Sequence, residues 1–244
     1  MTYVFLHGFS GGPESWDAVV TALPSDARVV RVQLAGHGAA PVSVEGWDAE
    51  VARIDALLER ERVEDAHLVG YSLGGRVGLS LLARAGSRFS KATLIGAHSG
   101  LPDAAARAER RAADDRWIRV LREQGLRAFI DAWEALPMWG SQGALDPEAL
   151  ASQRRLRESH TAEGLAHALE VLGLAQMPAT DPSALRMPIQ LVVGERDEKH
   201  RALSGALAER LPRAALRAVE GAGHNVVLER PDALAALLLR PEPS

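Results

Sequence analysis

Short apolar runs alternate along the chain with longer segments whose apolar residues recur at helical spacing. In residues 45–59, for example, Trp47, Val51, Ile54 and Leu58 fall on one face of a helix. Apolar runs typical of buried strands occupy residues 3–6, 27–34, 66–71, 92–96, 189–194 and 216–220. Because such strands are apolar on both faces and alternate with helices, the pattern predicts an α/β protein with a mostly parallel sheet, covered by helices on both faces.

Roughly 90 residues between the fourth and fifth of these strands carry no strand signal. Their apolar spacing predicts helices over residues 104–122, 126–135, 147–160 and 162–174. We therefore expect a helical lid, residues 98–180, inserted into a core formed by residues 1–97 and 181–244.

Composition limits the classes of protein to consider. With 244 residues, of which 47% are hydrophobic, the chain suffices for one α/β domain with an insertion. Its net charge of −4 gives no sign of nucleic-acid binding, and no apolar run approaches the length of a membrane span. Residues 1–6 lack basic side chains and are interpreted as a strand, not as a signal peptide. We expect a cytoplasmic monomer or small homo-oligomer without nucleic-acid partners or membrane insertion.

The sequence Gly-Tyr-Ser-Leu-Gly at residues 70–74 lies between a predicted strand and a predicted helix. Strand, sharp turn and helix are the setting of a G-x-S-x-G nucleophile elbow, with Ser72 at its apex. Such a turn strains the serine backbone, and Gly70 and Gly74 leave room where a Cβ would collide with it. The motif alone also fits a glycine turn beside a surface serine, but its setting favours a nucleophile.

A serine hydroxyl needs a base, usually histidine, which a buried carboxylate orients. In this α/β arrangement the chain order is serine, acid, histidine. Asp197 follows the fifth predicted strand and His224 follows the sixth, so both lie where parallel strands end and open sheets build their sites. Glu195 is an alternative acid, but it lies nearer the end of the strand. We therefore expect a triad of Ser72, Asp197 and His224.

An oxyanion hole needs two backbone N–H groups, one from the residue after the nucleophile and one from the loop after the first strand. Leu73 is the first of these, and Phe9 in the loop of residues 7–9 is the expected second. His37, in a Gly-His-Gly turn, has the ordinary interpretation of a structural loop residue. The chain has no cysteine, which excludes thiolate sites, and we expect neither a metal nor a cofactor.

Arginines at two places in the sequence are candidates for binding an anionic ligand. Arg76 lies one turn into the helix that the elbow opens, where a cation is disfavoured by about 0.3–1 kcal/mol unless an anion offsets the cost. The alternative is that the Arg76 side chain extends to solvent or pairs with an acidic neighbour. Residues 104–127 carry seven arginines and four acids, although the whole chain is negative. A solvated helix face is the ordinary interpretation of that run, and a cationic wall of a binding site is the other.

Several motifs resemble those of α/β hydrolases: Leu-His-Gly-Phe-Ser-Gly at 6–11, Gly-His-Gly at 36–38 and Gly-Tyr-Ser-Leu-Gly-Gly-Arg at 70–76. A narrower resemblance is to the 2-succinyl-6-hydroxy-2,4-cyclohexadiene-1-carboxylate synthases of menaquinone biosynthesis. It rests on Arg-Ala-Glu-Arg at 107–110, Asp-Arg-Trp at 115–117, Trp133, Arg157, Gly-Glu-Arg-Asp at 194–197 and Gly-His-Asn at 223–225.

This resemblance implies a lyase of the α/β-hydrolase fold. The family eliminates pyruvate from an enolpyruvyl precursor that bears several carboxylates. Ser72, activated by His224, would remove a proton beside the succinyl ketone, the oxyanion hole would hold the developing enolate, and no acyl-enzyme would form. By motif, the resemblance also implies that the substrate is bound by Tyr71, Arg76, Arg110, Trp133 and Arg157.

Two other classes of function remain open from the sequence. In a small-molecule esterase or carbon–carbon bond hydrolase, Ser72 would be a true nucleophile and would form an acyl-enzyme. A ligand receptor would keep the triad with little turnover. The fold alone does not choose among the three, and the arginines of the expected lid favour the lyase.

Overall fold

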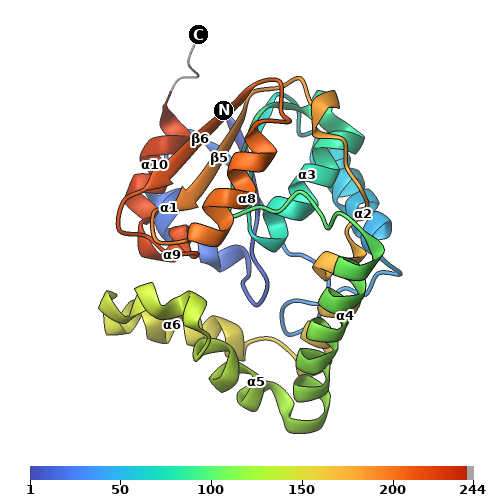
Figure 1. Cartoon of the computed structure of the whole chain (residues 1–244). Coiled ribbons are helices and arrows are strands. Elements are labelled where there is room, and N and C mark those ends of the chain that lie inside the picture. Colours follow the sequence, from blue (N-terminus) through green and yellow to red (C-terminus); the bar gives the residue numbers. More distant parts are fainter. Residues whose placement is uncertain (241–244) are drawn as a thin grey trace.

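The computed structural model describes residues 1–240, in which six strands form one sheet with helices on both of its faces (Figure 1). The strands are β1 Thr2–Leu6, β2 Arg28–Val32, β3 Ala66–Tyr71, β4 Phe89–Ile95, β5 Ile189–Gly194 and β6 Ala214–Val219. They lie in the order β2-β1-β3-β4-β5-β6, and all neighbouring pairs are parallel. The predicted α/β class and parallel sheet are therefore confirmed. The strand order reverses direction beside β1 and β3, so the segments that follow these strands meet at one edge of the sheet.

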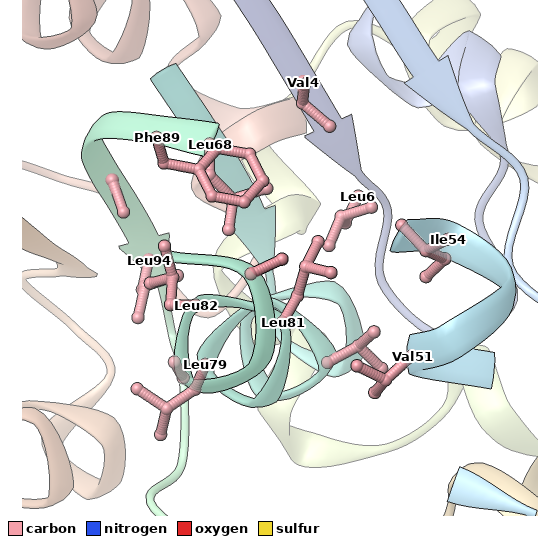
Figure 2. Close-up of a cluster of buried hydrophobic side chains, with 14 of the residues drawn as sticks. Val4, Leu6, Val51, Ile54, Leu68, Leu79, Leu81, Leu82, Phe89 and Leu94 are labelled. Carbon is pink, nitrogen blue, oxygen red and sulfur yellow. The ribbon is translucent and has the colours of Figure 1, made fainter. Parts of the chain in front are cut away.

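Alternate residues of the central strands face two different hydrophobic layers. The helices that cover the sheet are α1 Asp17–Thr21, α2 Trp47–Arg60, α3 Leu73–Ala85, α8 Glu198–Ala208, α9 Val226–Glu229 and α10 Pro231–Leu239. Val4, Leu6 and Leu68 pack in one layer with α2 and α3, part of which Figure 2 shows. Tyr3 and Phe5 pack in the other layer with α1 and α10. This two-sided burial explains why the strands have nearly continuous apolar sequences.

Four helices lie between β4 and β5, on one side of the core in Figure 1. These insertion helices are α4 Ala104–Arg119, α5 Gly125–Glu134, α6 Pro147–Glu158 and α7 Ala162–Leu172. Asp103, Asp146 and Thr161 cap α4, α6 and α7, each accepting a hydrogen bond from a backbone N–H of the first turn. The insertion helices have a small core of their own, in which Phe129 and Ile130 of α5 are fully buried.

Two histidines join the insertion helices to the core. The N–H of Gly38 donates to Nδ1 of His160 over 2.8 Å, and the N–H of Val44 donates to Nε2 of His167 over 3.2 Å. The helix predicted over residues 147–160 ends at Glu158, so His160 lies in the turn before α7. These contacts fix one end of the insertion helices against the loop that follows β2.

The boundaries expected for the core, residues 1–97 and 181–244, and for the lid, residues 98–180, stay a prediction. The insertion helices lie within residues 98–180. The last four residues of the expected core, 241–244, lie outside the described residues. Across residues 1–240 no helix combines the length and the apolar character that crossing a membrane requires.

The layer shown in Figure 2 leads to a prediction about stability. Leu79 is fully buried there, whereas Leu216 in β6 is 39% exposed. We expect Leu79→Ala to lower the free energy of unfolding by about 2–5 kcal/mol, because a cavity replaces packed methyl groups. The matched variant Leu216→Ala should change it by less than about 0.5 kcal/mol. Urea unfolding followed by circular dichroism checks both, and equal losses would contradict the assignment of the core.

Candidate active site

Ser72 occupies a strained turn between β3 and α3. Its φ of +50° and ψ of −105° lie outside the regions that most side chains adopt. A Cβ at Gly70 would lie 2.5 Å from the carbonyl oxygen of Gly74, and a Cβ at Gly74 would overlap the carbonyl of Leu6. The N–H of Ser72 donates to the carbonyl of Ile95 over 2.8 Å. The two glycines thus let the chain turn sharply against β1 and β4 and hold the serine at the ends of these strands.

Asp197, His224 and Ser72 form a chain of hydrogen bonds, as the sequence predicts. Nδ1 of His224 lies 2.6 Å from Oδ2 of Asp197, and Nε2 of His224 lies 3.2 Å from Oγ of Ser72. Asp197 follows β5 and caps α8, and His224 follows β6. The carboxylate accepts a hydrogen bond from Nδ1–H of His224. In the neutral ring Nε2 therefore carries the lone pair, which faces the serine hydroxyl.

The protonation states of this chain follow from burial and hydrogen bonding. Burial lowers the pKa of His224 below its ordinary value, although its hydrogen bond to Asp197 acts in the opposite direction. Burial alone would raise the pKa of Asp197, but hydrogen bonds from His200 and His224 outweigh it and lower that pKa. At neutral pH the site therefore holds a carboxylate beside a neutral imidazole, which is the state that can accept a proton.

The loop after β1 lies against the serine. Phe9 and Leu73 line the same cavity as Ser72, and Leu73 is the first residue of α3, so its N–H has no acceptor within the helix. A Cβ at Gly8 would lie 2.7 Å from the ring of Tyr71, so glycine is needed for this close approach. The arrangement places two backbone segments near Ser72, as an oxyanion hole requires.

A buried histidine fixes that loop. Nε2 of His37 accepts the N–H of Ser10 over 3.2 Å, and Nδ1 lies 2.9 Å from the carbonyl oxygen of Ala35. Burial, followed by the charges of His7 and His160, holds the pKa of His37 well below its ordinary value. A neutral His37 thus ties the residue after Phe9 to the loop after β2, which agrees with its interpretation as a structural loop residue.

A cavity of about 170 Å³ opens over Ser72. Six residues expected at the site line it together with the serine and His224, namely Phe9, Tyr71, Leu73, Arg76, Arg110 and Trp133. Other lining residues were not expected to contact the substrate, among them His98, Trp139, Lys199 and His200. The indole Nε1 atoms of Trp133 and Trp139 are buried and have no hydrogen-bond partner among residues 1–240.

Arg76 is a cation that pairs with no carboxylate of residues 1–240. It donates to the carbonyl of Leu172 over 3.2 Å and lies over the ring of Trp47, but no carboxylate of the described residues pairs with it. Burial, and after it the charge of Arg110, lowers the pKa of Arg76 to about 9. The side chain is still positive at neutral pH, and an anion in the cavity would relieve the cost of burying it.

Arg110 reaches the same cavity from α4. Its Nε donates to both carboxylate oxygens of the buried Asp114, over 2.9 and 3.0 Å. This contact uses one edge of the guanidinium and leaves the two terminal amino groups for another acceptor. Asp114 therefore orients Arg110 without using all of its donors.

Arg157 is placed differently from the other two arginines. Its side chain is buried, donates to Glu134 over 2.7 Å and lies 5.7 Å above the ring of Trp139. Trp139 lines the cavity over Ser72, whereas Arg157 does not. The structure thus does not bring the three arginines around one space, because α5 supplies Arg157 with a carboxylate and Trp139 covers it.

A second imidazole contacts Asp197. Nδ1 of His200 lies 3.0 Å from Oδ1 and 2.8 Å from Oδ2 of the carboxylate, and the His200 ring centroid is 4.2 Å from that of His224. Asp197, His200 and His224 are also near enough to share a metal ion. Both Nδ1 atoms approach the same carboxylate oxygen, however, so hydrogen bonding accounts for the cluster. The spacing of an N-cap aspartate and a histidine three residues later is the signal by which the sequence indicates this contact.

Comparisons with known proteins identify the family of this chain. The model of the alpha/beta hydrolase family matches residues 3–237, and the parallel sheet with its serine elbow defines the same class. Two relatives named 2-succinyl-6-hydroxy-2,4-cyclohexadiene-1-carboxylate synthase, from Salmonella typhimurium and Salmonella agona, are each 35% identical over 242 residues, which cover 96% of this chain and 92% of theirs. The chain therefore belongs to the alpha/beta hydrolase family and, within it, to the family of these synthases.

Solved structures show the same fold. The structure of MenH from S. aureus has a TM-score of 0.92 at 29% identity, covering 98% of this chain and 92% of that one. A thermophilic esterase from Thermogutta terrifontis, solved with malate bound, has a TM-score of 0.83 at 23% identity, with coverages of 98% and 88%. The second likeness concerns the fold alone.

The position of His224 leads to a prediction about Gly96. This glycine has a φ of +55°, and a Cβ there would lie 2.9 Å from Cε1 of His224. We expect Gly96→Ala to displace the imidazole and to slow the labelling of Ser72 by a fluorophosphonate by about tenfold or more, since one hydrogen bond of the base is lost. Gly205→Ala in α8 meets no atom within 4 Å and is the control. Parental labelling of a folded Gly96→Ala variant would contradict the assignment of His224 as the base.

Proposed function

We propose that the protein eliminates pyruvate from 2-succinyl-5-enolpyruvyl-6-hydroxy-3-cyclohexene-1-carboxylate to give 2-succinyl-6-hydroxy-2,4-cyclohexadiene-1-carboxylate. The observation that carries the proposal is the cavity over Ser72, which Arg76 and Arg110 line in a chain of this synthase family. The substrate is a small anion, no cofactor takes part, and the cytoplasm is the proposed location.

The charge of the cavity suits the substrate. The precursor has three carboxylates, on the ring, the succinyl chain and the enolpyruvyl group. Burying an unpaired carboxylate costs several kcal/mol, so each needs a fixed donor. Arg76 has no carboxylate partner in the described part of the chain, and Arg110 keeps its terminal amino groups free of Asp114. These two guanidiniums are the proposed anchors, and Tyr71 and Trp133 complete the binding walls.

The triad is proposed to act as a base. Nε2 of neutral His224 takes the proton of the Ser72 hydroxyl as the serine oxygen removes the proton from the ring carbon that bears the succinyl ketone. The electron pair of that C–H bond forms the C2=C3 double bond, the former C3=C4 pair moves to C4=C5, and the C5–O bond breaks. Enolpyruvate leaves and takes up a proton as it becomes pyruvate. No bond forms between Ser72 and the substrate.

The oxyanion hole and the insertion helices have complementary roles in this proposal. The N–H groups of Phe9 and Leu73 bind the ketone oxygen, where negative charge develops as the proton leaves. Residues 98–180 form a lid that places Arg110, Trp133 and Trp139 over the elbow and excludes water from the reacting carbon. Arg157 supports this lid through Glu134 and the face of Trp139.

Pyruvate release tests the reaction directly. With the enolpyruvyl precursor, the purified protein should release pyruvate, and Ser72→Ala should lower kcat about 10³-fold or more because the triad acts as a unit. Ser90→Ala, at an exposed position of β4, is the matched control. Intact mass spectrometry of quenched turnover mixtures should show unmodified protein. An adduct on Ser72 would identify an esterase or carbon–carbon bond hydrolase instead.

The arginines give a second prediction. Arg76→Ala and Arg110→Ala should each raise KM for the precursor about 10- to 100-fold, since each removes charge-assisted hydrogen bonds that are individually worth about 1.5–3 kcal/mol. Lysine at either position should restore only part of the loss, because it cannot bind a carboxylate with two parallel hydrogen bonds. Arg119→Ala, on the exposed side of α4, should bind like the parent. Equal KM values in all variants would show that the arginines do not bind the substrate.

A further inference from the structure

His200 makes contacts that the mechanism above does not use. It lies in the first turn of α8, and its Nδ1 is within hydrogen-bond distance of both oxygens of the Asp197 carboxylate. The same Oδ2 atom accepts Nδ1 of His224 over 2.6 Å. The two imidazole rings are inclined by 33°, with centroids 4.2 Å apart. One carboxylate therefore serves two histidines that lie against each other.

We propose that His200 is a positioning residue that holds Asp197 and, by sharing its carboxylate, keeps the basicity of His224 low enough for a neutral base at working pH. The proposal rests on the proposed function for its kinetic consequences. It assigns to His200 a role in tuning the base, and none in contacting the reacting atoms.

Contacts with His200 hold the Asp197 carboxylate in one orientation. A carboxylate on a single aromatic partner can rotate about its Cβ–Cγ bond, which would change the approach of His224 to Ser72. In this structure Oδ1 accepts the backbone N–H of His200 over 3.3 Å, and the His200 side chain contacts both oxygens. These contacts fix the carboxylate plane at the start of α8, and with it the tautomer and orientation of His224.

His200 also affects the charge that Asp197 presents to His224. A carboxylate stabilises the imidazolium form of its histidine, and every further hydrogen bond to that carboxylate weakens the effect because it disperses the negative charge. A positive charge on His200, 4.2 Å from His224, would act in the same direction. The pKa of His224 is indeed lowered, first by burial and then by His200, against the raising effect of Asp197.

Other charged groups surround this pair and stay constant in a His200 variant. Glu229 of α9 raises the pKa of His224, whereas Lys199 of α8 and Arg76 of α3 add positive charge on the cavity side. His98, which follows β4, has its pKa lowered to about 4, first by burial and then by Arg76, and is neutral at working pH. A change in the behaviour of His224 on replacing His200 alone thus reports the loss of His200, through the shared carboxylate and through its charge.

Two variants separate packing from hydrogen bonding. His200→Phe keeps a ring against His224 and removes the hydrogen bond to Asp197. His200→Asn loses the ring but keeps a donor, since the amide nitrogen of asparagine stands near the place of Nδ1. The rate constant kcat/KM, measured from pH 5 to 9, reports the free enzyme and rises as His224 loses its proton.

In His200→Phe the Asp197 carboxylate keeps the hydrogen bond from the His224 side chain and loses the one from the His200 side chain. His224 therefore stays protonated to a higher pH. We expect kcat/KM to fall roughly 3- to 10-fold at pH 8, and a further 5- to 10-fold at pH 5.5, as a tenfold change accompanies a displacement of one pH unit. In His200→Asn the additional loss at pH 5.5 should largely disappear. An unchanged acidic limb in His200→Phe overturns the proposal even if kcat falls, and an asparagine variant that matches the phenylalanine one overturns the hydrogen-bond argument.

A readout without substrate keeps this inference distinct from the proposed function. In protein labelled with ¹⁵N-histidine, NMR follows the titration of the His224 ring, which should move to higher pH in His200→Phe and return toward the parent in His200→Asn. If the parent releases no pyruvate but the ring titrations move as expected, the function is wrong and the role of His200 stands. If the parent releases pyruvate and the titrations coincide, the role of His200 is wrong.

Discussion

The positive φ of Ser72 is the constraint on which the site depends. An L-residue is held in that conformation only where its surroundings oppose relaxation, at a cost of about 1–3 kcal/mol. Here β3 enters the turn, α3 leaves it, and the N–H of Ser72 is bonded to β4. A Cβ at Gly70 or Gly74 would collide with carbonyl groups of the turn or of β1, so the turn requires glycine at both positions. The buried layer around α3 supplies the packing that keeps the strained serine in place.

Asp197 shows how the fold concentrates several tasks on one group. The carboxylate caps α8 and accepts hydrogen bonds from the side chains of His224 and His200. A cap at a helix N-terminus favours the ionised form, because the first backbone N–H groups point at it. The start of α8 therefore stabilises negative charge on the acid, as the start of α3 would do in the proposed oxyanion hole. Both depend on helices that begin directly after parallel strands, which is a property of the topology.

The sequence predicts more of the core than of its periphery, for physical reasons. Buried parallel strands are apolar on both faces, so five of the six begin and end within two residues of the expected positions. β4 begins earlier, at Phe89, because Ser90 and Lys91 interrupt the apolar run. The helix α8 was not predicted. Its sequence, Glu-Lys-His-Arg-Ala-Leu-Ser-Gly-Ala-Leu-Ala, buries little more than Ser204 and Leu207, so no apolar stripe marks it.

Within the site, too, residues that follow strands of the sheet were easier to predict than residues of the insertion. Ser72, Asp197 and His224 are brought together in the order the sequence indicates, because each follows a strand of one sheet. The position of Arg157 depends on Glu134 and Trp139, which come from other segments of the insertion helices. No local pattern fixes such a three-way contact. The role of His200 in the site could be read only from the spacing to Asp197, and the approach of its ring to His224 depends on how α8 meets the loop after β6.

A triad of this kind is also the machinery of hydrolases, so the outcome of the reaction depends on which substrate atom faces Ser72. A carbonyl carbon at the serine oxygen leads to an acyl-enzyme, whereas a C–H bond there leads to proton removal. The triad has the same geometry in both cases. What differs is the anchoring of the substrate, and the anchors proposed above are cations on α3 and α4, Arg76 and Arg110, which line the same cavity as Ser72. Ser72 caps the helix that carries Arg76, and both side chains line one cavity, so a carboxylate bound by Arg76 would lie near the serine oxygen. Under the proposed function, α3 thus begins at the strained serine and also carries the cation that sets which bond of the substrate the serine meets.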